Sequence, residues 1–373
     1  MGMSGKALSV LTARVGNGGG KWFPYRTSVR APRLETTPAR FIARDARCTI
    51  DGAGTRCTSV RCPMKLVIGY DGSEAADAAL EDLARAGLPD TGEALVVAAS
   101  DGWPQAEPGL GPSATKVPIW LTPSLKDAHA QVERELDNAR TMAATATGRL
   151  ARILPGWRVE YDAALDSPRR AIVSRADSFD ADLIVVGSHG RSGIARLLLG
   201  SVSQSVLTHA HCSVRVGRAH RIRDYKPVKV LVGIDGSVGS ATAVSAVALR
   251  KWPAGSLARV VAVADLAIST AVPVAAFAAA HAPTVEQTPQ DWISHAARQV
   301  AQELRDAGLD ASPQVCQGDP KRVLVEQADG WDADCIFVGA SGIRGVERFL
   351  LGSVSSAVAA RAHCSVEVVR QPR

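Results

Sequence analysis

One long segment occurs twice in this sequence, and the repetition constrains the possible folds more than any other feature. The first copy is ADLIVVGSHGRSGIARLLLGSVSQSV, Ala181–Val206, and the second is ADCIFVGASGIRGVERFLLGSVSSAV, Ala333–Val358. At the same spacing, HCSV at 211–214 recurs at 363–366. A self-similarity of this length predicts two units with the same fold in one chain.

The repetition begins well before these segments. KLVIGYDGS at 65–73 recurs as VLVGIDGS at 230–237, and we therefore predict two domains, 64–218 and 227–370. Each has the size of an ordinary single domain. The two segments of this match are further apart in sequence than the two long copies above, which indicates about a dozen extra residues in the first copy. We expect them in the Pro/Gly-rich segment Asp101–Trp120.

Residues 1–63 differ from the rest of the chain in charge and pattern. They hold eleven Lys and Arg against Glu35, Asp45 and Asp51, a net charge of +8, whereas the whole chain is +6. The remainder is therefore slightly acidic, which argues against a nucleic-acid-binding body. The Gly-rich start and the lack of periodicity predict a disordered leader without the apolar core of a secretory signal. We expect the natural product to begin at Met64, and an organelle transit peptide is the alternative.

The seven cysteines show neither a disulfide pattern nor metal-ligand spacing. Cys212 and Cys364 occupy equivalent places before an apolar run and are interpreted as small core residues. An odd, unpaired set suits a reducing compartment, so we expect the cytoplasm. The longest apolar stretch, 260–280, is interrupted by Asp265 and Pro273. It predicts a strand and a loop, and no membrane span or membrane partner.

Each predicted domain alternates strand-like and helix-like segments. In the first domain they are 65–69, 75–86, 94–99, 128–153, 158–163, 168–176, 183–186, 201–209 and 213–216. In the second domain they are 229–233, 241–250, 260–264, 292–307, 312–316, 320–328, 335–338, 353–360 and 365–369. This predicts an α/β, Rossmann-like fold, with two tandem open five-stranded parallel sheets and helices on both faces. Loops after the strands then share one edge, where ligands of such sheets bind.

Each copy contains the motif Gly-x2-Gly-x9-Gly-Ser between a strand and a helix. Glycines allow a positive φ and the close approach of a ligand. A Gly-Ser helix entry offers unpaired N–H groups and the positive end of the helix dipole to a phosphate, and the Ser201 and Ser203 hydroxyls are further donors. Asp71 and Asp235 end the first strand of each domain, where a carboxylate suits a ribose hydroxyl or a phosphate-bound metal ion. The alternative is that these glycines are only turns and a helix entry.

At these residues the chain resembles the universal stress protein family in its tandem-domain form. The resemblance implies the fold of the adenine-nucleotide alpha-hydrolases and ATP with Mg²⁺ as the ligand. It implies that the motif holds the phosphates, that the Asp lies near the nucleoside, and that an apolar residue late in the second strand contacts the base. The implied binding residues are Asp71, Ala99, Gly187, Gly190, Gly200, Ser201, Val202 and Ser203, and then Asp235, Val263, Gly339, Gly342, Gly352, Ser353, Val354 and Ser355.

The resemblance also implies how the two units contact each other. Members of the family commonly dimerise through the last strand, so an intramolecular pseudo-dimer through 213–216 and 365–369 is implied, and a further homodimer is compatible with it. Ser188-His189 of the first loop is replaced by Ala340-Ser341 in the second. We expect this change to lower the occupancy of the second site or to alter its ligand preference.

Three functions compete at this stage. The leading one is a non-enzymatic, ATP-binding stress protein whose conformation or partner binding depends on nucleotide. The second is an interaction scaffold with vestigial sites, and the third is a slow ATPase or transferase that depends on Asp71 or His189. The Gly-Lys-Ser/Thr of a Walker motif is absent, and neither a catalytic residue nor a metal site is predicted. We expect Gly187→Val to abolish nucleotide binding by filling the phosphate approach, without unfolding the protein.

Overall fold

The computed structural model describes residues 63–100, 122–190, 199–219, 227–264, 289–342 and 351–371. The chain divides after Arg61, and every element below belongs to the part from Cys62 to Arg373. The predicted leader and the segment Asp101–Trp120 lie outside the described residues.

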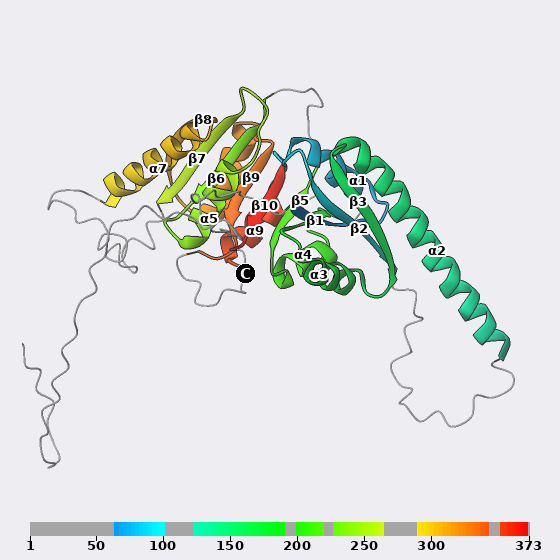
Figure 1. The fold of residues 1–373 in the computed structure, drawn as a ribbon. Coiled ribbons are helices and arrows are strands. Elements are labelled where there is room, and N and C mark those ends of the chain that lie inside the picture. The colour runs from blue at the N-terminus through cyan, green and yellow to red at the C-terminus, as the bar shows by residue number, and fades with distance from the viewer. Residues whose placement is uncertain are drawn as a thin grey trace, which may run out of the picture. The chain divides into compact units, whose positions relative to one another are not determined.

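The two repeats contain the same series of elements (Figure 1). In the first repeat these are β1 Met64–Gly69, α1 Glu74–Asp82, the 3-10 turn η1 Leu83–Arg85, β2 Gly92–Ser100, α2 Thr122–Ile153, β3 Trp157–Leu165, α3 Pro168–Phe179, β4 Leu183–Gly187, α4 Ser201–His209 and β5 Ser213–Gly217. In the second they are β6 Lys229–Ile234, α5 Val238–Ala248, β7 Leu257–Ala264, α7 Pro289–Asp306, β8 Asp310–Gln317, α8 Pro320–Gly330, β9 Cys335–Gly339, α9 Ser353–Arg361 and β10 Ser365–Val369. Every predicted strand and helix is present, with ends that differ by a few residues.

Local sequence explains where the first helix of each repeat begins. The serine of each Asp-Gly-Ser turn is the N-cap residue, and its hydroxyl accepts a hydrogen bond from the first turn. Ser73 accepts from Ala76 N at 3.2 Å, and Ser237 accepts from Ser240 N at 3.1 Å. Such caps satisfy a backbone donor that the helix itself cannot. They hold the segment after the first strand in place at the edge of the sheet.

The ten strands form one sheet in the order β3-β2-β1-β4-β5-β10-β9-β6-β7-β8. Pairing within each repeat is parallel, which confirms the predicted α/β class. The repeats are joined by β5 and β10, which run antiparallel with Val216 opposite Val366 and Val214 opposite Val368. The five-stranded sheets are therefore continuous with each other rather than separate. A buried, apolar last strand needs a partner for its outer N–H and C=O groups, and the other repeat supplies it.

Helices cover both faces of this sheet. In the first repeat, α1 and α2 bury one apolar cluster, whereas α3 and α4 pack on the opposite face. The apolar cluster under α3 and α4 is shared between the repeats, because it also contains residues of α8 and α9. The central strands β4 and β10 are buried along their whole length. Such strands are typical of parallel sheets covered on both sides.

The helices of the two repeats differ most in length at α2, whereas the predicted place of the extra residues, Asp101–Trp120, lies outside the described residues. Helix α2 has 32 residues whereas its equivalent α7 has 18. Among the residues of α2 whose side chains are described, 130–153, those that are buried are Ala139, Ala143, Ala146 and Leu150. Figure 1 shows the N-terminal part of α2 extending past the strands.

Among the described residues, none of the helices combines the length and the apolar character that a membrane crossing requires.

Candidate functional site

The structure brings the motif loop of the first repeat against the aspartate that follows β1. A Cβ atom placed on Gly190 would lie 3.2 Å from Oδ2 of Asp71. The two residues are far apart in sequence, but β1 and β4 are parallel neighbours, with Ile68 opposite Val185. Loops that leave neighbouring parallel strands at the same end must meet. The absence of a side chain at Gly190 leaves this approach to the carboxylate open.

Asp71 is itself held by the turn in which it lies. Its Oδ1 accepts hydrogen bonds from the backbone N of Ser73 at 3.0 Å and from the Ser73 hydroxyl at 2.6 Å. Gly72 between them has a φ of 75°, a conformation that glycine adopts without cost. The carboxylate is therefore fixed in position before any ligand arrives.

Helix α4 begins beside this loop with an N-terminus that lacks a side-chain cap. Gly200 is the N-cap residue, with φ −62° and ψ 150°, and its own N–H donates to the Ser188 carbonyl at 2.8 Å. The first-turn N–H groups of Ser201, Val202 and Ser203 have no acceptor within a regular helix. Together with the helix dipole they make this end favourable for an anion.

One part of the predicted site needs correction, because the Ser203 hydroxyl donates inside the protein. It is buried and donates to the Gly187 carbonyl at 2.6 Å. Its counterpart Ser355 donates to the carbonyls of Ala340, at 3.1 Å, and Gly352, at 2.9 Å. These hydroxyl hydrogens join the helix to the strand and loop before it. A phosphate would instead meet backbone N–H groups and the exposed Ser201.

The role predicted for Gly187 is also different in the structure. A Cβ atom at this position would lie 2.7 Å from the carbonyl carbon of Ala75, in the backbone of α1. At Gly339, it would lie 2.4 Å from the carbonyl carbon of Gly239. These glycines allow the first helix of each repeat to pack closely on the end of the fourth strand. The expectation that Gly187→Val leaves the fold intact is therefore wrong, since backbone cannot move aside cheaply.

Ala99 and Val263, the predicted base contacts, occupy equivalent positions late in β2 and β7. Ala99 is opposite Ala164, and Val263 is opposite Cys316. Both are partly buried against the apolar cluster shared by the repeats. Ala99 lies two residues beyond Val97, the partner of Gly69, so it is at the same edge as Asp71. A contact with a base stays a prediction.

The second repeat has the same arrangement, with its loop closer to the aspartate that follows β6. A Cβ atom on Gly342 would lie 2.7 Å from Oδ2 of Asp235, whose Oδ1 accepts from Ser237 N at 2.9 Å. Helix α9 begins at Ser353 after an N-cap Gly352 without a side-chain cap. The Ser237 hydroxyl lies 3.5 Å from the Ser341 carbonyl instead of donating to the aspartate.

His189 has the polar environment of a ligand contact. Its Nδ1 lies 2.9 Å from the Ser188 hydroxyl, while its buried Nε2 has no hydrogen-bond partner among the described residues. Buried polar atoms are normally satisfied, so an exception of this kind in a glycine-rich loop at the edge of the sheet calls for a ligand or a water.

Sequence reasoning missed two polar contacts near the first site. The Tyr70 hydroxyl donates to Asp77 at 2.7 Å, and Asp77 also pairs with Arg149 of α2. Burial, followed by this hydrogen bond, raises the pKa of Tyr70 to about 12. At the end of β2, the Ser100 hydroxyl donates to Glu135 of α2 at 2.9 Å. No sequence signal joins these residues, because their contact depends on where α2 crosses the sheet.

The histidine and cysteine pairs do not form a metal site within the described part of the chain, where no cluster of three or more His, Cys, Asp or Glu side chains is found. Burial raises the pKa of the Cys212 and Cys364 thiols to about 12, so both stay protonated near neutral pH. Both pack against the shared apolar cluster. This agrees with the interpretation as small core residues.

Comparison with known proteins places the chain among related sequences over most of its length. The sequence profile of the universal stress protein family matches residues 64–218 and 228–370. Universal stress protein Rv2005c of Mycobacterium tuberculosis is 30% identical over 320 residues, covering 82% of this chain and 97% of that protein. A universal stress protein of Mycolicibacterium smegmatis is 28% identical over 324 residues, covering 82% and 96%. The crystal structure of a universal stress protein from Archaeoglobus fulgidus matches with a TM-score of 0.53 at 19% identity, covering 82% of this chain and 98% of that one.

Proposed function

Because the chain belongs to the universal stress protein family, we propose that it binds ATP with Mg²⁺ once in each repeat. Nucleotide occupancy sets the conformation of the chain or its affinity for protein partners. No turnover is required for this role, and the proposal is of a non-enzymatic regulator. The cysteine content suits the reducing cytoplasm as its place of action.

The observation that supports the proposal is the meeting of three features in both repeats. A motif glycine lies beside the aspartate after the first strand, so that an added Cβ would be 3.2 Å from Oδ2 of Asp71 at Gly190 and 2.7 Å from Oδ2 of Asp235 at Gly342. Beside each loop, α4 or α9 begins without a side-chain cap. A bare backbone loop, a helix N-terminus and a fixed carboxylate are together what a nucleoside phosphate requires.

The residues divide into three tasks around such a ligand. Backbone N–H groups at Ser201, Val202 and Ser203, or at Ser353, Val354 and Ser355, would hold the phosphates. Asp71 and Asp235 would hold a ribose hydroxyl or the magnesium ion, and Ala99 and Val263 would contact the base. Mg-ATP would supply charge and binding energy at this site. The protein's own contribution is to orient it.

His189 supports a stronger first site. A phosphate oxygen near its Nε2 would satisfy a buried atom that otherwise lacks a partner among the described residues. Hydrogen bonds to a charged group such as a phosphate contribute about 1.5–3 kcal/mol, which corresponds to a difference in affinity of about tenfold or more. The second loop has Ser341 at this position and cannot make the same contact.

Titration calorimetry of the full chain with Mg-ATP tests the proposal. We expect two binding events per chain, one lost in Gly190→Val and the other in Gly342→Val. These glycines are chosen because the nearest atom to an added Cβ is a carboxylate oxygen rather than backbone. Gly148→Val is the matched control, since a Cβ there meets nothing within 4 Å. Unchanged binding in both loop variants would refute the site, and no binding by the unmodified chain would favour an interaction scaffold.

A further inference from the structure

An arginine that follows the last strand of the second repeat reaches the end of α4 in the first. Arg370 donates from its backbone N to the Ser213 hydroxyl at 3.1 Å. Its guanidinium donates to the carbonyls of Cys212, at 3.5 Å, and Leu207. Leu207 lies in the last turn of α4, and Cys212 lies in the turn that leads from α4 into β5. The contact therefore joins the second repeat to the helix that begins at the first candidate site.

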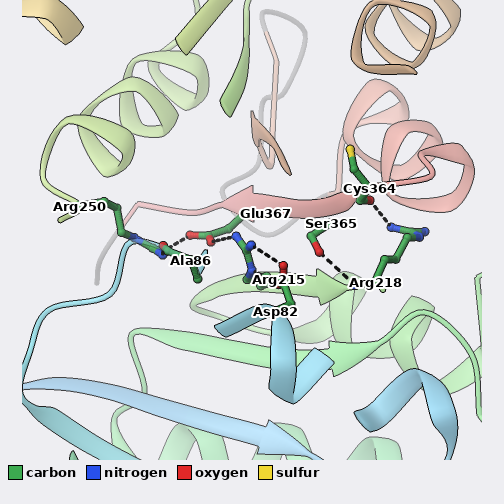
Figure 2. Close-up of polar contacts among 8 residues, drawn as sticks. All are labelled: Asp82, Ala86, Arg215, Arg218, Arg250, Cys364, Ser365 and Glu367. Atoms are coloured by element: carbon green, nitrogen blue, oxygen red, sulfur yellow. Dashed lines mark hydrogen bonds and ion pairs between the residues drawn. The ribbon is translucent and has the colours of Figure 1, made fainter. Parts of the chain in front are cut away.

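The reciprocal contact exists at the equivalent residue of the first repeat. Arg218 donates from its backbone N to the Ser365 hydroxyl at 3.0 Å, and from its guanidinium to the carbonyls of Cys364, at 3.2 Å, and Ala359, at 2.6 Å. Figure 2 shows Arg218 extending from the first repeat toward Ser365 and Cys364 of the second. Ala359 lies in the last turn of α9. Each repeat thus sends one arginine to the corresponding helix of the other.

Both arginines are buried, and the groups they meet are carbonyl oxygens. Burial lowers the pKa of Arg218 to about 10, and burial likewise lowers the pKa of Arg370. A cation near the last carbonyls of a helix is favourable, because those carbonyls carry the negative end of the dipole. Two buried donors on a single guanidinium also fix the direction of the helix end.

The opposite ends of the same helices are fixed within their own repeat. The Gly200 N–H donates to Ser188, and the Ser203 hydroxyl donates to Gly187. Between these contacts and the arginine lies one helix of nine residues, about 13 Å long at the usual rise per residue. A helix this short moves as a unit. Its N-terminus is consequently set by contacts from both repeats.

We propose that Arg370 is a positioning residue of the first nucleotide site and Arg218 is a positioning residue of the second. Each repeat then orders the phosphate-binding helix of the other repeat. The inference rests on the proposed function and adds a crossed dependence between the sites. By linkage, nucleotide bound to one repeat stabilises the pairing of β5 with β10 to the extent that this pairing improves binding.

Hydrogen exchange on the full chain tests the structural half of the inference without any nucleotide. Arg370→Ala should reduce protection at the end of α4, where Ala210 N donates to Val206, and spare the end of α9. Arg218→Ala should do the reverse at Ala362 N, which donates to Val358. Each variant is the matched control of the other. Equal loss in both helices, or loss confined to the arginine's own repeat, would overturn the crossed arrangement.

Binding constants test the functional half. In a Gly342→Val background, which keeps only the first site, Arg370→Ala should weaken Mg-ATP binding about fivefold, at the lower end of typical couplings. In a Gly190→Val background, the same change should leave the second site's constant unaltered, and Arg218→Ala should show the opposite pattern. Arg370→Lys, which has one ammonium group in place of the two donor nitrogens of the guanidinium, should recover only part of the loss. A full recovery would show that charge alone matters and would contradict positioning.

Two further outcomes separate the hypotheses. Equal weakening of both sites by either arginine variant would indicate general loosening of the interface and would overturn the inference. If the unmodified chain binds no Mg-ATP, the proposed function fails. The exchange pattern then still decides whether each arginine orders the helix of the other repeat.

Discussion

The loop Ser188–Gly190 of the first repeat and the loop Ala340–Gly342 of the second occupy equivalent places with different clearance. In the first, the second residue of α1 is Ala75, and the Ser73 hydroxyl donates to Asp71. In the second, the equivalent residue of α5 is Gly239, where an added Cβ would lie only 2.2 Å from the Ser341 carbonyl oxygen. The second loop therefore lies closer to α5 than an alanine at position 239 would permit.

A glycine motif therefore sets the path of the loop but not its final fit. A Cβ atom added at Gly342 would lie 2.7 Å from Oδ2 of Asp235, whereas one added at Gly190 would lie 3.2 Å from Oδ2 of Asp71. The Ser237 hydroxyl also donates to the Ser341 carbonyl of the loop, whereas the equivalent Ser73 hydroxyl donates to Asp71. Residues outside the motif decide how much room remains for a phosphate.

The repeats differ as strongly where they meet. Arg215 of β5 is directly opposite Glu367 of β10, and these are equivalent positions. Arg215 donates to Asp82 at 3.0 Å and to Glu367 at 3.2 Å, and Glu367 also pairs with Arg250 (Figure 2). Burial lowers the pKa of Arg215, but the charge of Asp82 and then that of Glu367 outweigh it, so the net shift is upward. Because the two repeats carry opposite charges at this equivalent position, a first repeat pairs more favourably with a second repeat than with another copy of itself.

The largest expected effect comes from making these positions alike. Arg215→Ala removes the cation that pairs with the buried carboxylates of both Asp82 and Glu367, and it should cost about 3–5 kcal/mol of unfolding free energy. Arg215→Glu, which copies the second repeat into the first, should cost more because like charges then face each other. Denaturant unfolding measures both. The exposed Arg158→Ala is the control and should change stability by about 0.5 kcal/mol or less. If Arg215→Glu is no worse than this control, the unlike charges do not matter.

The next largest effect separates the two glycines of one motif. Gly187→Val should destabilise the fold by about 1–3 kcal/mol or more, because its Cβ meets the backbone of α1. Gly190→Val should cost far less stability and should lose nucleotide binding. Parallel denaturation and calorimetry on each variant decide this. A stable Gly187→Val that has lost only binding would restore the simpler interpretation of that glycine.

A smaller effect is expected from exchanging loop residues between the sites. With the first site removed by Gly190→Val, the double change Ala340→Ser and Ser341→His should strengthen the second site about tenfold, the equivalent of one added hydrogen bond to a charged group. The reciprocal change, Ser188→Ala with His189→Ser, should weaken the first site similarly. Calorimetry provides the constants. No change in either direction would mean that His189 does not contact the ligand.

The smallest difference between the repeats is expected at the two cysteines. Burial raises the pKa of both thiols from 9.0 to about 12, so folding favours the protonated form. Their contribution to stability is therefore complete below pH 9 and is lost as the pH rises toward 12. Alkylation of the native protein, followed by mass spectrometry from pH 8 to 10, should find both thiols slow and similar. Rapid labelling of one at pH 8 would show that the repeats differ there.

Periodicity and motif spacing were sufficient to predict the strands, the helices and the residues that meet at the sheet edge. Asp71 and Gly190 could be placed together because parallel strands fix which loops are neighbours. The contacts of Ser203, Gly187, Arg218 and Arg370 could not be predicted. They depend on atomic distances between segments far apart in sequence, and serine, glycine or arginine at such positions has several ordinary roles. The ten-stranded sheet was implied only by family resemblance, since an apolar last strand does not specify its partner.

The central claim, that both repeats hold a nucleotide, is tested most directly by the content of the purified full chain. One sample of the protein is denatured by heat, and the small molecules that it releases are identified by mass. A parallel sample is kept native and titrated with Mg-ATP to count the sites that are still empty. We expect released ATP in molar proportion to the chain, and two equivalents bound after Mg-ATP is added, with the second repeat filling last. No released nucleotide together with no binding of added Mg-ATP would contradict it.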